Sequence, residues 1–176
     1  MRIRPALVAA TATALVLLPV ATGASAAAVP TASPAAVAVC RAGAVETTAT
    51  RTATPHVIRI SVTHKGGAAC VVDRIPTVTF GELDGAARPV PAAASAPYRL
   101  AAGGSAYAAV RTLDPAAEGS RAVAFLTVAA DPSHHGTRFD AASVGSSGTI
   151  RVWDPVTTLW QSTAAKADAA LAAATR

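Results

Sequence analysis

The chain has 176 residues, so a single domain is the default expectation. Hydrophobic residues make up 52% of it but aromatic residues only 4%, so any core depends on a few Ile, Leu, Phe and Trp side chains among many alanines. The net charge is +5, and the basic residues are scattered singly, without the Lys/Arg clusters and interleaved aromatics of a nucleic-acid-binding surface.

The first 26 residues have the pattern of a secretory signal peptide. Arg2 and Arg4 precede an apolar stretch at 6–20, which is short for a membrane span, and residues 24–26 (Ala-Ser-Ala) form a small-x-small cleavage signal. Cleavage after this signal would remove two of the 15 basic residues and leave 13 against 10 acidic ones, a net charge of +3. We therefore expect a secreted, extracellular protein with no membrane span after cleavage; an uncleaved N-terminal anchor is the alternative.

Residues 27–38 are rich in Ala, Pro, Ser and Thr and show no periodicity, which predicts a flexible linker. Cys40 follows shortly after. A lipidation site needs a small residue directly before the cysteine, and Val39 is not small, so the sequence argues against a lipid anchor at Cys40.

The segment from Arg51 to Phe80 organises the rest of the chain. Ile58, Ile60 and Val62 alternate with polar residues, and this period of two predicts a strand with one buried face. A Gly-Gly pair at 66–67 follows and favours a turn.

Further strand candidates and turns extend from residue 39 to residue 158. The pattern predicts an all-β domain, an antiparallel immunoglobulin-like β-sandwich of about seven strands with one disulfide; a small barrel is the alternative. Two loops, at 86–97 and 131–147, are long or polar enough to form a contact surface. The candidate strands are residues 44–51, 54–64, 75–83, a short one around Val90, 105–111, 121–130 and 148–156.

Residues 159–176 form an alanine-rich tail with strong helical propensity. Its apolar side chains present little area, so the sequence gives this helix small reason to pack against the domain.

Cys40 and Cys70 are the two cysteines of the chain. In an exported protein they are expected to form a disulfide bond. A redox or metal-binding pair is the alternative, but nothing resembles the Cys-x-x-Cys pattern of such sites.

Several of these features resemble a known family. Residues 58–80 resemble the "strand, Asn-x-Gly turn, Cys, then Gly-x-Pro-x-Val" signature of the actinobacterial secreted family called domain of unknown function 4232, residues 100–108 resemble its "Leu-x-Pro-Gly-Gly-Ser-Ala" strand entry, and Cys40 matches its first cysteine. Arg74 and Ala102 stand where Gly and Pro are common. The resemblance, over about residues 40–156, implies a secreted or surface-attached immunoglobulin-like β-sandwich with a disulfide. It implies no activity and carries over no functional residues.

Candidate sites are few. His134 and His135, with Asp131 before them, are the one polar cluster that suggests a metal, but a zinc site needs three or four converging ligands and a solvated loop is the better interpretation. Ser146 or Ser147 could complete a Ser-His-Asp triad with this cluster, although no Gly-x-Ser-x-Gly motif is present. We therefore assign no catalytic, cofactor-binding or metal-binding residue and expect no cofactor.

The large aromatic side chains are expected to fill the core. Trp160 lies beyond the last predicted strand and is the one candidate for a surface anchor to a partner or glycan.

The sequence favours a secreted, monomeric, non-enzymatic binding or structural module at the cell envelope, with an unknown protein or a cell-wall component as partner. A secreted hydrolase or metal-dependent enzyme that uses the His134/His135 loop is the second hypothesis. A third is an extracellular protease inhibitor that presents residues 86–97, but no disulfide holds that loop in a fixed shape.

Overall fold

The computed structural model describes residues 37–175, which belong to one compact unit. The predicted signal peptide and residues 27–36 of the predicted linker lie outside the described residues. The described elements are η1 (Ala42–Ala44), β1 (Val45–Arg51), β2 (Val57–His64), β3 (Cys70–Asp73), β4 (Thr77–Phe80), β5 (Arg88–Val90), β6 (Pro97–Leu100), β7 (Ser105–Arg111), β8 (Arg121–Val123), β9 (Phe125–Ala129), β10 (Thr137–Asp140), β11 (Ile150–Val152), β12 (Val156–Thr158) and α1 (Ala164–Ala174).

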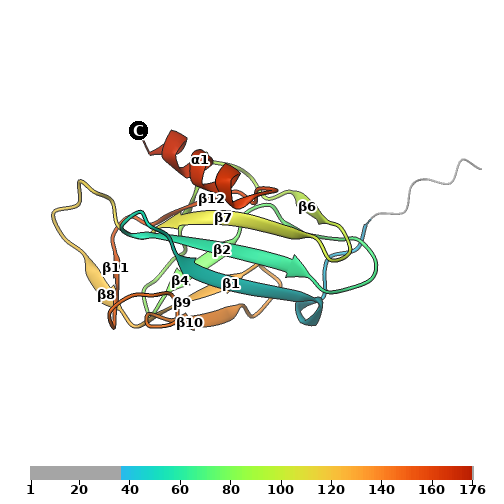
Figure 1. The fold of residues 1–176 in the computed structure, drawn as a ribbon, viewed down its shortest axis with the longest axis horizontal. Helices are drawn as coiled ribbons and strands as arrows, with labels where there is room; N and C mark the ends of the chain where they lie inside the picture. The colour runs from blue at the N-terminus through green and yellow to red at the C-terminus, as the bar shows by residue number, and fades with distance from the viewer. Residues whose placement is uncertain (1–36, 176) are drawn as a thin grey trace, which may run out of the picture. The chain divides into compact units, whose positions relative to one another are not determined.

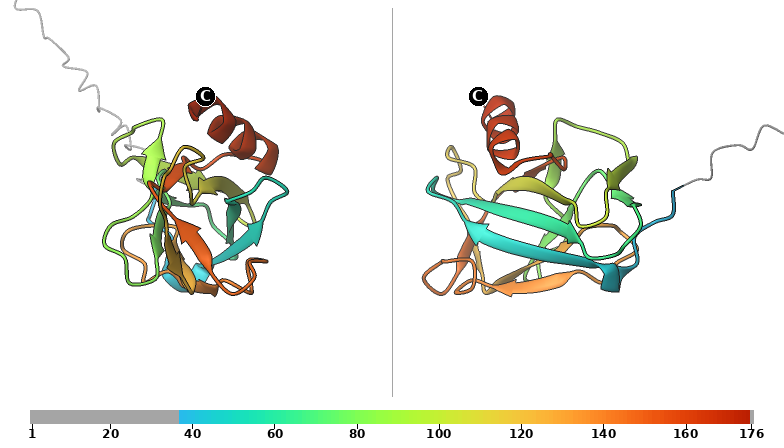
Figure 2. Two further views of the ribbon diagram at one scale, coloured as in Figure 1. Left: turned by 90° about the vertical axis from the view of Figure 1, so that its left-hand side faces the viewer. Right: turned by 45° about the vertical axis from the view of Figure 1, so that its right-hand side comes forward.

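The strands form two main sheets and two short ribbons (Figure 1). The larger sheet has the order β1-β2-β7-β12-β5, and the smaller one has the order β10-β9-β4. Each described pair of strands is antiparallel except β12 with β5. The ribbons β11-β8 and β3-β6 lie toward opposite ends of the larger sheet (Figures 1 and 2). The fold is therefore mostly β, with one short C-terminal helix.

Strand β2 has the buried face that its alternation predicts. Ile58, Ile60 and Val62 are at most 4% exposed, while the residues between them are half-buried. Strands β1 and β7 both pair with β2, so the predicted strand lies inside the sheet and not at its edge.

The two main sheets share one hydrophobic core. Ala106, Ala108 and Val110 of β7 lie in the same cluster as Val78 of β4 and Val128 of β9. Because alanines occupy so many of these positions, most of the core's bulk comes from a few larger side chains. Besides Trp160, which is 3% exposed, the largest of these are Phe80, Ile60, Leu100 and Leu126.

The predicted disulfide is confirmed. The Cys40 and Cys70 sulfurs are 2.03 Å apart, and both residues are buried. The neighbouring backbone is paired as well, because Cys40 N donates to Val71 O (2.8 Å) and Val71 N donates to Ala38 O (3.0 Å). The bridge thus ties the start of the domain to β3.

The strand count differs from the prediction of about seven. The predicted strand at 121–130 divides at Ala124 into β8, which pairs with β11, and β9, which pairs with β4 and β10. The predicted strand at 148–156 likewise divides into β11 and β12, and Asp154 between them has a left-handed backbone (φ 47°). The first break carries no turn signal in the sequence, whereas the second falls at Asp154-Pro155, a pair that favours a turn.

The expectation that the alanine-rich helix has little reason to dock is wrong. Helix α1 begins at Thr163, whose side chain accepts a hydrogen bond from Lys166 N (3.2 Å), and it lies over β7 and β12 (Figure 1). Ala167 and Leu171 are buried against a second apolar cluster on the outer face of the larger sheet. Because alanine side chains are small, the helix can approach the sheet closely, and one leucine side chain then suffices to fill the space between them. No helix within residues 37–175 is long and apolar enough to span a membrane.

Candidate functional site

Polar side chains of the His134/His135 loop form hydrogen bonds with other groups of the protein. His134 Nε2 lies 2.8 Å from Cys40 O, and both carboxylate oxygens of Asp131 accept hydrogen bonds, Oδ1 from Ser133 and Oδ2 from Asp73 N (2.9 Å). No group of three or more His, Cys, Asp or Glu side chains in the described part of the chain is placed to hold a metal ion. These contacts fasten the loop beside the disulfide.

The structure does not bring the hypothetical Ser-His-Asp residues together. His134 lines a small hollow with Val45 at the start of β1, whereas Ser146 and Ser147 line another hollow with Arg51 at the end of β1. Strand β1 has seven residues, and at about 3.3 Å per residue its two ends are roughly 20 Å apart.

The structure also places the two loops that the sequence suggests as a contact surface. Loops 86–97 and 131–147 both meet Asp73, whose carboxylate accepts a hydrogen bond from Ser95 and whose N–H donates to Asp131 Oδ2 (2.9 Å). Residues 143–147 lie beyond β10, which separates them from that meeting point, and Arg88–Val90 form strand β5. At Asp73 the end of the first loop therefore lies close to the start of the second.

The hydrogen bonds at Asp131 have a consequence for the pH dependence of stability. Burial alone would raise the pKa of this carboxyl, but the Ser133 hydroxyl, the N–H groups of Ser133 and Asp73, and the nearby His134 outweigh it and hold the pKa below its ordinary value. The ionised carboxylate therefore stabilises the fold at pH values above its ordinary pKa, and this contribution is lost as the pH falls through the lower, folded pKa.

We expect Asp131→Asn to lower the free energy of unfolding at pH 7 by about 1 kcal/mol, because an amide offers one acceptor oxygen and no charge to these donors. The difference from the wild type should shrink as the pH falls toward about 2, because the wild-type carboxyl takes up its proton as the pH falls through its lowered pKa. Urea denaturation at both pH values measures it. Asp84→Asn, at an exposed side chain with no hydrogen bond to residues 37–175, is the control and should change little at either pH. A loss at Asp131→Asn that persists undiminished at pH 2 would contradict the prediction.

The two tryptophans lie opposite to expectation. Trp160, the expected surface anchor, is 3% exposed, and its backbone N–H donates to Arg74 O (3.0 Å). Trp153, expected in the core, is 48% exposed. Trp153 directly follows β11, and its backbone forms an isolated bridge with Leu113, outside both main sheets.

A groove of about 700 Å³ lies between α1 and the β1–β2 turn. We call it the helix groove. Helix α1 forms one wall, the turn at 52–56 another, and the segment after β7 a third. Most of its lining is apolar and includes Pro55, Val57, Leu113, Pro115, Leu171 and Ala172.

Two arginines give the helix groove a polar floor. Arg59 forms an ion pair with Asp168 of α1, and Arg111 forms one with Asp114 (2.6 Å). The Arg111 side chain is only 13% exposed and that of Arg59 33%. Arg59 Nε, Arg111 Nε and Asp168 Oδ1 are buried without a hydrogen-bond partner among the described residues. Buried polar atoms normally have hydrogen-bond partners, so three such atoms without a partner on one surface are unusual.

The sequence alone does not predict the helix groove, because the groove depends on the register in which β2 pairs with β7. Arg59 lies opposite Ala109 on β7, and Arg111 lies two residues further along the same strand, so both arginines share the outer face of the sheet. No sequence pattern pairs β2 with β7 in that register, and none places α1 above them. The one usable signal was that Arg59 alternates with the buried residues of β2 and so points outward.

A model of one protein family matches residues 40–161, and its description is Domain of unknown function (DUF4232). The chain belongs to the DUF4232 family. The match runs from the first cysteine to the segment before α1, so this DUF4232 domain includes both main sheets and the disulfide. Neither curated proteins nor solved structures include a significant match to the chain.

Proposed function

We propose that this protein is an exported, non-enzymatic binding module with an immunoglobulin-like β-sandwich fold, and that the helix groove is its binding site. The export proposal is supported by the signal-peptide pattern of residues 1–26 and by a disulfide of the kind that persists outside the cytoplasm. The sandwich proposal is supported by the core that the β2/β7 sheet shares with the β4/β9 sheet. The parallel pairing of β12 with β5 is its clearest departure from a purely antiparallel sandwich.

The lining of the helix groove carries the binding proposal. A concave, mostly apolar site with a few convergent polar groups is the usual form of a small-molecule site. A guanidinium has five N–H donors, and the ion pairs of Arg59 and Arg111 each use one of them. The groove therefore suits an amphipathic carboxylate, whose apolar body would contact Leu113 and Leu171 while its acidic group reaches the arginines.

Filling the groove should abolish such binding. Decanoate is the probe, and we expect Ala172→Trp to weaken its binding at least tenfold, because residue 172 lines the groove and an indole there would occupy the space of the ligand. Titration followed by ¹H–¹⁵N NMR measures the affinity and maps the contact residues.

Ala173→Trp is the matched control. Ala173 is the next residue of the same helix, is also exposed and does not line the groove, so this variant should bind decanoate like the wild type. If the wild type does not bind decanoate saturably, or if both tryptophan variants bind it equally well, the helix groove is not the site.

A further inference from the structure

A second hollow lies at the same end of the larger sheet and differs from the helix groove in chemistry. It encloses about 210 Å³, and the side chains that give it its character are Arg51, His56, Ser146, Ser147, Thr149 and Arg151. None of the residues that line it is acidic. We call it the arginine hollow.

The two arginines of the hollow carry charges that no carboxylate neutralises. Arg51 Nη1 donates to Gly145 O (3.1 Å) and Arg151 Nε donates to Ser120 Oγ (2.8 Å), so neutral groups hold both side chains. Neither forms an ion pair within residues 37–175. Other basic side chains of that range do, among them Arg59, Arg88 and Arg111. The hollow therefore concentrates positive charge.

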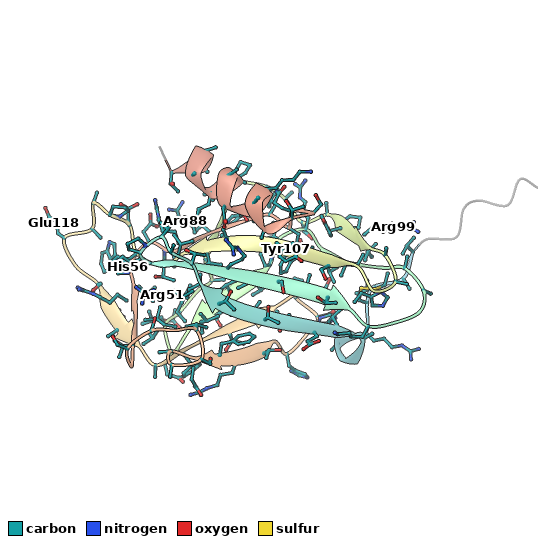
Figure 3. The ribbon with its side chains drawn as sticks, in the orientation of Figure 1. Arg51, His56, Arg88, Arg99, Tyr107 and Glu118 are labelled. Atoms are coloured by element: carbon teal, nitrogen blue, oxygen red, sulfur yellow. A yellow bond between two sulfur atoms is a disulfide. The ribbon has the colours of Figure 1, made fainter. Side chains whose placement is uncertain are left out.

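His56 adds an imidazole at the rim. It has a left-handed backbone (φ 58°), which is uncommon for a residue other than glycine. Its carbonyl accepts hydrogen bonds from Thr112 N (2.8 Å) and Thr112 Oγ1 (3.3 Å), which hold the turn in that conformation. Figure 3 shows His56 and Arg51 at the same end of the molecule, far from Arg99 at the other end.

The hydroxyl groups come from the loop after β10. Gly145 and Gly148 both have left-handed backbones, and Ser146 N donates to Ala141 O (2.8 Å), so the loop folds back on itself beside Arg51. The hydroxyls of Ser146, Ser147 and Thr149 make no hydrogen bond to other side chains or backbone groups of the described residues. They are free to donate to a ligand.

We propose that the arginine hollow is a binding site for a phosphate group. Two guanidinium groups, an imidazole and three hydroxyls supply more donors than the two oxygens of a carboxylate can accept, whereas a phosphate presents three or four acceptor oxygens. Guanidinium groups also match phosphate geometry by paired hydrogen bonds. At about 30 Å³ for each water molecule, the hollow has room for several waters, so part of the molecule that bears the phosphate fits as well.

The site is tested by calorimetric titration with inorganic phosphate at low ionic strength, with chloride as the comparison anion. The wild type should bind phosphate saturably and chloride not. Arg51→Gln and Arg151→Gln should each weaken phosphate binding at least tenfold. Arg99→Gln, which removes the same charge from an exposed position on β6, should leave the affinity within twofold of the wild type.

A wild type that binds phosphate no better than chloride would overturn the proposal, as would an equal loss in Arg99→Gln and Arg51→Gln, because the effect would then follow net charge and not the hollow. Arg151→Gln guards against a folding artefact, since its side chain is exposed and bonds only to Ser120. His56→Asn removes the imidazole and introduces a residue that tolerates the left-handed backbone. This variant should weaken phosphate binding without loss of the fold.

Two further arms identify the source of the phosphate. Glycerol 3-phosphate tests a soluble phosphate ester, and vesicles that contain phosphatidylglycerol test a lipid headgroup. The probe that binds to the wild type but not to Arg51→Gln is the one that binds in the arginine hollow. The test is also independent of the helix groove, because Arg51 does not line that groove. Arg51→Gln should therefore leave decanoate binding unchanged, and Ala172→Trp should leave phosphate binding unchanged.

Discussion

Reduction of the disulfide between Cys40 and Cys70 should lower the free energy of unfolding by about 3.5–4 kcal/mol. The bridge joins residues 30 apart in the sequence, and a loop of that length gives this value from the chain entropy that the bridge removes from the unfolded state. Domains of this size are stable by about 5–15 kcal/mol, so the expected loss is a large fraction of the total. Both cysteines lie in the main hydrophobic cluster, so free thiols there would also disturb its packing.

Urea denaturation with and without dithiothreitol measures this effect. The double variant Cys40→Ala/Cys70→Ala is the control: it should be as unstable as the reduced wild type, and reductant should not change it. If the reduced wild type is within 1 kcal/mol of the oxidised protein, the bridge contributes little and the core must be stronger than its alanine content indicates.

The parts of the fold that the sequence predicts well are those in which one local signal decides the structure. Strand β7 occupies Ser105–Arg111, as the run after the Gly-Gly pair at 103–104 predicts. The outward and inward faces of β2 follow from strict alternation. The disulfide follows from there being two cysteines in a chain whose first 26 residues have the pattern of a signal peptide.

The parts that the sequence does not predict depend on partners distant in the chain. The apolar residues of 121–130 predict a strand, but they do not show that the segment changes sheets at Ala124. The count of apolar side chains in the tail is low, but it does not show that Leu171 meets a cluster formed by Val57, Ala109 and Val156. Burial of a helix depends on the surface it finds as much as on its own composition.

The same distinction explains the candidate sites. The sequence draws attention to His134 and His135 because they are adjacent, yet adjacent residues need not converge, and His134 bonds to the Cys40 carbonyl. Arg51 and Arg151, in contrast, are a hundred residues apart in the sequence, and only the fold brings them to the same hollow. The fold likewise brings together Arg59 and Asp168, which are also distant in the sequence. Both hollows that we propose as binding sites were therefore beyond sequence reasoning.

The two proposed sites are neighbours. His56 and Val57 contribute to the lining of both the helix groove and the arginine hollow. Short turns on a rigid sheet commonly carry binding residues, because the sheet holds the turn while the turn is free to vary in sequence. The end of the larger sheet around His56 is thus the part of the DUF4232 domain where we expect ligand contacts to gather.

Phe80→Ala should have an effect as large as that of the disulfide, a loss of about 3–5 kcal/mol in the free energy of unfolding. Phe80 is 2% exposed and is among the largest buried side chains, opposite Leu126 in the smaller sheet. In a core filled mostly by alanine and valine, few neighbours are large enough to move into the space that its ring would leave, so the cavity should persist. Urea denaturation, followed by the fluorescence of the buried Trp160, measures the change.

Phe125→Ala is the matched control, because it makes the same substitution in the same sheet at a half-buried ring. The Arg138 guanidinium lies 3.6 Å from the centroid of that ring, so the variant loses a cation–π contact and partial burial but opens no enclosed cavity. We expect it to cost about 1–2 kcal/mol. Equal losses in the two variants would mean that the sheets close around the missing Phe80 ring. In that case the alanine-rich core is more adaptable than its fixed packing suggests, and its stability depends on the disulfide more than on any single side chain.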